Sequence, residues 1–191
     1  INERILLEEN DTKPNLTSAR TALFSITGMI IIMILNITGV INVDQGCMFI
    51  AGALVIGCSV AIVVMGMSPK IGAMKSTKYV IMGLVLAEAW IVSISLYQWA
   101  ALIIVFPLLT AMQYHNKIIT WLSFGATVLI ALTSGMFALA FGTLQPDYSI
   151  WMLEILGFEL PDPLPTSGSY DIAEAAKMIL CYVSLPQTVV A

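Results

Sequence analysis

The sequence predicts an all-α fold: a polytopic membrane helix bundle with six transmembrane helices and a cytoplasmic N-terminus. Composition is the first reason, since 59% of residues are hydrophobic, 10% are charged and the mean hydropathy is +0.92. Soluble domains carry about 25% charged residues. The second reason is that Lys and Arg recur in every other connection between the long apolar stretches. Cytoplasmic loops retain these cations, so the bias predicts both the number of spans and their orientation.

The charges divide between the two sets of connections. Seven of the eight Lys and Arg residues precede the first apolar stretch or lie in alternate connections: Arg4, Lys13, Arg20, Lys70, Lys75, Lys78 and Lys117. The other connections are mostly acidic and hold Asp44, Asp147, Glu154, Glu159, Asp162 and Asp171. With a net charge of −4, the chain is not expected to bind nucleic acid. Its expected partner is the lipid bilayer, as a multi-pass protein of the plasma membrane.

The first elements follow from apolar length and from helix-ending residues. Residues 1–20 are predicted as a cytoplasmic or interfacial segment, in which Pro14 ends a short amphipathic helix over 1–10. Residues 21–191 form the predicted transmembrane domain. Each span needs ~20 apolar residues, and the first two are expected near 22–41 and 47–67.

Four further spans are expected near 79–96, 99–113 and 118–141 and in a sixth helix that begins at Asp171. An extracytoplasmic loop is expected over residues 142–170. Pro107 in the fourth span and Pro186 in the sixth are predicted hinges, because proline removes a helical hydrogen bond. Small residues recur every four positions in the second span, at Ala53, Gly57 and Ala61. This spacing predicts a face for close helix packing, and dimerisation through it is a hypothesis.

Glu88 is the first candidate functional residue, because it falls near the middle of the third span. A carboxylate at that depth costs roughly 2.5 kcal/mol or more and must be buried, paired or protonated. Lys177 and Asn36 are its candidate partners. Two roles stay open at this point: a buried polar clamp that fixes helix register, or a site that senses a ligand or a proton.

Other chemistry is sparse. His115 is the only histidine, so no multi-histidine metal site is expected, and no phosphate loop, GxSxG or HExxH motif occurs. We therefore expect neither catalysis nor a cofactor in these residues. Trp151, in the outer loop, is a candidate either for anchoring at the membrane interface or for a lid that holds a small molecule through aromatic faces.

Two stretches carry a resemblance to a known group. They are LYQWAALIIVFPLLTAMQYHNK (96–117), with its central Pro-Leu-Leu, and AEAAKMILCYVSLPQTVVA (173–191), with its Leu-Pro. Both resemble the N-terminal membrane region of Firmicute signalling proteins with a GGDEF, histidine kinase or phosphatase output. The resemblance covers most of the chain from Tyr79 onward. The basic exit and the output domain of that pattern are absent here, so no enzymatic activity carries over.

The sequence thus favours the transmembrane sensory domain of a bacterial signalling protein. It would relay a ligand or the state of the membrane to a missing cytoplasmic output domain, which could itself be enzymatic. The chain begins at Ile1 and ends in an apolar stretch, which predicts a piece of a longer protein. The alternative is a small six-helix transport protein, such as the substrate-binding subunit of a vitamin importer, with Glu88 or Trp90 lining its cavity.

Overall fold

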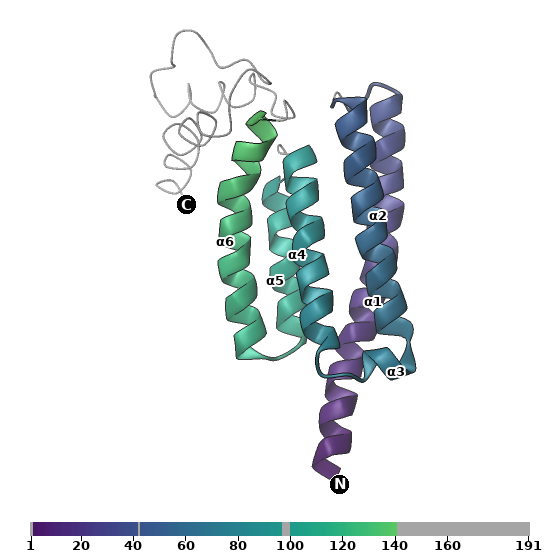
Figure 1. Ribbon diagram of the computed structural model, residues 1–191, viewed down its shortest axis with the longest axis vertical. Coiled ribbons are helices and arrows are strands. Elements are labelled where there is room, and N and C mark those ends of the chain that lie inside the picture. The colour runs from purple at the N-terminus through teal and green to yellow at the C-terminus, as the bar shows by residue number, and fades with distance from the viewer. Residues whose placement is uncertain (1, 42, 97–99, 141–191) are drawn as a thin grey trace.

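The protein is a bundle of helices in the computed structural model, which describes residues 2–41, 43–96 and 100–140 (Figure 1). These residues contain no strand. Their helices, in chain order, are α1 (Asn2–Ile37), α2 (Gln45–Met67), α3 (Pro69–Gly72), α4 (Thr77–Ser95), α5 (Ala100–Gln113) and α6 (Lys117–Ala140). The expected sixth span and the outer loop, with Trp151, Lys177 and Pro186, lie outside the described residues.

Four of these helices are long and apolar enough to cross a membrane: the stretches Thr12–Ile37, Gln45–Met67, Thr77–Ser95 and Lys117–Ser134. The membrane character predicted from composition is therefore supported by helix length. The described residues do not show six spans. Helix α5 has 14 residues and is about 21 Å long, shorter than the ~30 Å apolar core of a bilayer.

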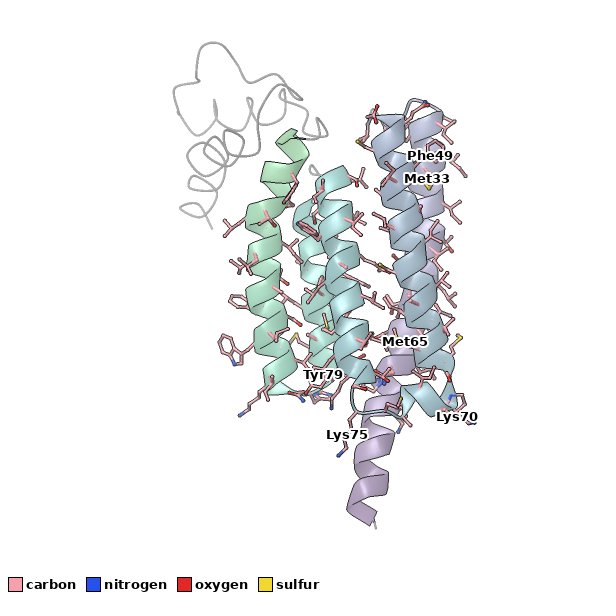
Figure 2. All side chains as sticks on the ribbon, viewed as in Figure 1. Met33, Phe49, Met65, Lys70, Lys75 and Tyr79 are labelled. Atoms are coloured by element: carbon pink, nitrogen blue, oxygen red, sulfur yellow. The ribbon has the colours of Figure 1, made fainter. Side chains whose placement is uncertain are left out.

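Neighbouring helices run in opposite directions where the connections are short. Helices α1 and α2 pack along their length, α2 packs on α4, and α4 packs on α5 and α6. Figure 1 shows α1 projecting beyond the bundle at the end where α3 and the α5–α6 turn lie. Lys70, Lys75 and Tyr79 lie at this same end, whereas Met33 and Phe49 lie near the other (Figure 2). We call it the basic end.

Side-chain burial in the bundle follows the pattern of a protein surrounded by lipid. Large apolar side chains face outward on every long helix; examples are Phe24, Ile50, Val80, Leu109 and Leu129. Many buried side chains are small and hydroxylated, such as Ser59, Ser93, Ser123 and Ser134. Lipid tails are as apolar as leucine, so exposure of leucine costs little there, and close packing of small residues drives helix association instead.

Helix α1 continues through Pro14, so the prediction that this proline ends a separate helix is wrong. An interior proline costs ~3 kcal/mol in an isolated helix. Here Pro14 is buried, and the next residue, Asn15, donates a side-chain hydrogen bond to the carbonyl of Gly72 at 2.9 Å. Contacts with distant parts of the chain offset the lost helical bond, and sequence propensity does not include such contacts.

Side chains cap the N-termini of two helices, α2 and α6. The Asp44 carboxylate accepts the backbone N–H of Cys47 at 2.8 Å, and this hydrogen bond lowers the pKa of Asp44 below its usual range. Its negative charge also suits the positive end of the α2 dipole. Asn116 accepts the backbone N–H of Ile118 at 2.9 Å and begins α6. Asp44 and Asn116 thus fix where two membrane-length helices begin, at opposite ends of the bundle.

Helices α1 and α2 approach each other closely at Gly66. A Cβ atom at Gly66 would lie 2.5 Å from the Asn15 carbonyl oxygen and 2.8 Å from the Ala19 Cβ. At Gly52 the nearest atom is instead the flexible Met33 side chain. Neither glycine belongs to the face that the sequence predicted. Ala53 and Gly57 are exposed, and a Cβ at Gly57 would have no neighbour within 4 Å.

We predict that Gly66→Ala destabilises the protein by about 1–3 kcal/mol, because the backbone of α1 must shift to admit the methyl group. Gly28→Ala is the matched control, since no atom lies within 4 Å of its added Cβ. That variant should be neutral or more stable by up to ~1 kcal/mol. Reversible unfolding in mixed micelles measures both. Equal effects of the two substitutions would contradict the close approach at Gly66.

Candidate functional site

Glu88 lies inside the bundle, where side chains from three helices meet. The residue is 5% exposed. Its Oε1 accepts the hydroxyl hydrogen of Ser59 from α2 at 2.5 Å, and its Oε2 accepts that of Ser25 from α1 at 3.4 Å. We call Glu88, Ser59 and Ser25 the central cluster.

The central cluster lies deep within the candidate membrane spans. Ser25, Ser59 and Glu88 each lie within three residues of the middle of Thr12–Ile37, Gln45–Met67 and Thr77–Ser95, respectively. Apolar side chains of the same three helices are buried next to it in the sequence, among them Met29 of α1, Val55 and Ile62 of α2 and Val85 of α4. The cluster is therefore a polar layer in an otherwise apolar interior, which is where polar groups act most strongly on one another.

The two hydroxyls contribute unequally to the central cluster. A separation of 2.5 Å lies at the short end for O–H···O hydrogen bonds and is typical of charge-assisted ones, whereas 3.4 Å is long. At this depth in the bundle, the hydrogen bond that joins α2 to α4 is thus strong, and the one that joins α1 to α4 is weak. A change in the charge of Glu88 acts on both contacts at once.

The expected partners of Glu88 are placed elsewhere or lie outside the described residues. Asn36 is buried near the end of α1, where its Oδ1 accepts the backbone N–H of Val43 at 3.0 Å. It therefore holds the α1–α2 connection and not the carboxylate. Lys177 lies outside the described residues. Among those described, no Lys, Arg or His makes an ion pair with Glu88.

Trp90 lies on a different face of α4 from Glu88. Its indole N–H donates to the Thr133 hydroxyl of α6 at 3.1 Å, and its ring packs edge-on against Phe137 with 5.4 Å between centroids. Glu88 faces α1 and α2, because residues two positions apart do not share a helix face. Trp90 therefore fastens α4 to α6 and does not line the central cluster.

A second polar network lies at the basic end. The Tyr114 hydroxyl donates to Asn15 Oδ1 at 2.8 Å, and the Asn15 side-chain amide donates to the Gly72 carbonyl. The Ser18 hydroxyl lies 3.4 Å from the same tyrosine oxygen. We call Asn15, Ser18, Gly72 and Tyr114 the basic-end network. It joins α1, α3 and the residue that follows α5, which lie far apart in the sequence.

Sequence reasoning missed Ser25, Ser59 and the basic-end network. The available signal was that hydroxyl and amide side chains inside apolar spans face protein in preference to lipid. That signal predicts which face of a helix is buried, but it does not predict which residue on another helix is the hydrogen-bond partner. Ser25 and Ser59 are 63 and 29 residues from Glu88 in the sequence. Pro107 lies inside α5 and is buried there, and its role as a hinge stays a prediction.

The arrangement can hold or release a proton, and the described residues contain no metal-binding group of three or more His, Cys, Asp or Glu side chains. His115 is exposed in the α5–α6 turn with a φ of 47°. The chain matches no protein-family model, and neither a curated protein nor a solved structure matches it. Function must therefore be argued from the central cluster.

We predict that Tyr114→Phe lowers the free energy of unfolding by about 1–3 kcal/mol, because the fully buried Asn15 side chain loses a hydrogen-bond donor to its Oδ1. Tyr79→Phe removes the same hydroxyl from an exposed tyrosine at the same end of the bundle and is the control. Its effect should stay within about 0.5 kcal/mol. Unfolding of both variants in mixed micelles measures the difference. Equal stabilities of the two variants would contradict the role of the basic-end network.

Proposed function

We propose that the chain is the transmembrane input domain of a bacterial signal-transduction protein in the plasma membrane. In this proposal it relays a ligand or the state of the membrane to a cytoplasmic output domain. The observation that carries the proposal is the meeting of Glu88, Ser59 and Ser25 from three helices in the middle of their candidate spans. Ionisable residues at this depth are costly and are kept mainly where they have a function.

A sensor needs two packing arrangements that a stimulus can bias. The central cluster supports this requirement, because a proton or ligand that competes for the Glu88 oxygens alters the contacts of α4 with both α1 and α2. The weak Ser25 contact favours α1 as the helix that responds. Pro107 and Pro186 are proposed hinges in the fourth and sixth spans, with Pro186 outside the described residues.

The proposal includes a topology. We place the basic end in the cytoplasm, since Lys and Arg are retained on that side. Six spans would bring the C-terminal continuation to the same side as the N-terminus. The face of α2 with Ala53, Gly57 and Ala61 remains a proposed dimer contact, since Ala53 and Gly57 are exposed and a Cβ at Gly57 has no neighbour within 4 Å among the described residues.

Labelling of single cysteines in whole cells tests the topology. In a background with Cys47, Cys58 and Cys181 replaced by Ser, Lys75→Cys should react with a membrane-impermeant maleimide only after lysis. Gln45→Cys, at the opposite end of the bundle, should react in intact cells. Both results follow from a cytoplasmic basic end, and reaction of residue 75 from outside would contradict the orientation.

The coding sequence downstream of Ala191 tests the function. A helical linker that leads into a globular output domain is the expected result. A stop codon within a few residues would overturn the sensor and favour the alternative, a six-helix transport protein such as a vitamin-importer subunit. With the output domain present, Glu88→Gln should abolish the response to the stimulus. The matched variant Ser95→Ala should retain the response, because Ser95 donates only to its own helix, at Ile91.

A further inference from the structure

The contact between Ser59 and Glu88 contains space for a hydrogen atom and nothing larger. Their oxygens are 2.5 Å apart. Oxygen ligands contact Mg²⁺ or Ca²⁺ at about 2.0–2.6 Å each, and ligands from two different side chains that share such an ion lie farther apart than this. The geometry of the central cluster therefore suits a proton shared between oxygens and does not suit a metal ion.

The helices around Glu88 offer almost no other charge. Helix α2 has no Asp, Glu, Lys, Arg or His, and its ionisable side chains are Cys47 and Cys58. Helix α1 has none of those five residue types after Arg20, and α5 has none at all. On α4 and α6 the other charges, Lys78 and Lys117, lie at the basic end. Cys58, which is half-buried on α2, is the ionisable side chain of these helices that interacts electrostatically with Glu88.

A buried carboxylate without a facing cation changes its charge most readily by taking up a proton. When Glu88 is ionised, the Ser59 and Ser25 hydroxyls donate to it and stabilise the charge. When a proton from water binds the carboxylate, the new O–H can donate to Ser59 Oγ. The Ser59 hydroxyl then turns from donor to acceptor, so the α2–α4 contact persists in both states. The Ser25 contact is already long and weakens further, because a neutral acceptor binds a donor less strongly.

From these contacts we infer that Glu88 is a reversible proton-binding site in the middle of the membrane and that the proton is the stimulus of this domain. The second half of the inference rests on the proposed function, whereas the binding site itself does not. Protonation loosens α1 from α4 and leaves α2 in place. The ligand class of the central cluster is thus the hydrogen ion.

Labelling with dicyclohexylcarbodiimide, an apolar carbodiimide, tests the site in the full chain reconstituted in phosphatidylcholine vesicles. The protonated carboxyl adds to the reagent: its proton moves to a carbodiimide nitrogen, its oxygen bonds to the central carbon, and the adduct rearranges to a stable acylurea. Peptide mass spectrometry should find the adduct on Glu88 at acid pH and less of it as pH rises. Glu88→Gln should carry no adduct at this position.

Substitution of the hydroxyls tests the geometry. Ser59→Ala removes a hydrogen bond that is stronger to the ionised carboxylate than to the protonated one, so the pH at half-maximal labelling should rise by about one unit. Ser25→Ala should raise it by less, because its contact is longer, and serves as the second variant if Ser59→Ala does not fold. Ser95→Ala is the matched serine control on α4 and should leave the midpoint unchanged.

Three results would overturn the proton site. These are labelling of Glu88 that does not depend on pH, labelling suppressed when sodium replaces potassium at constant pH, and a midpoint that neither Ser59→Ala nor Ser25→Ala moves. The second result would identify a sodium site. Failure of the sensor proposal is distinct, because labelling reads the carboxyl directly and requires no output domain. If the labelling of Glu88 depends on pH but the gene ends soon after Ala191, the proton-binding site is supported and the sensor proposal is rejected.

Discussion

The absence of a hydrophobic driving force between helices in lipid is the constraint on which the rest of this structure depends. Apolar side chains gain little by leaving lipid for protein, so close backbone approach and interhelical hydrogen bonds must hold the bundle. The structure provides both. Gly66 brings α1 and α2 together, and polar contacts join the helices at two depths. This constraint explains why leucine, isoleucine and phenylalanine face outward while serine, asparagine and a glutamate are buried.

The basic-end network and the central cluster differ in the chemical groups that form their hydrogen bonds. The basic-end network is built from amide and hydroxyl side chains and a backbone carbonyl, with no carboxyl group among them. The central cluster contains a carboxyl group, and its contacts change strength when the charge changes. Near the basic end, α1 is therefore held by the hydrogen bonds of Asn15, and in its middle by the contact of Ser25 with Glu88, whose strength depends on charge. The contact at Ser25 thus depends on the charge of Glu88, whereas the contacts at Asn15 do not.

The sequence predicted helix positions well and side-chain partners poorly. Expected bounds such as 47–67 and 118–141 fall close to α2 and α6, because apolar length alone sets them. The depth of Glu88 could also be predicted from its place in the third span. Its hydroxyl partners could not, since they depend on how helices rotate against one another. For the same reason the prediction at Pro14 was wrong: α1 continues through this proline, next to a buried hydrogen bond between Asn15 and Gly72, 57 residues away.

The unbroken length of α1 has a mechanical consequence. Asn15 and Ser25 lie ten residues apart on one helix, a rise of about 15 Å. No proline or glycine lies between them. A displacement of Ser25 would therefore tilt this part of α1 about Asn15, whose side chain is held by Gly72 and Tyr114. A small displacement of Ser25 would thereby change the tilt of α1 over this length.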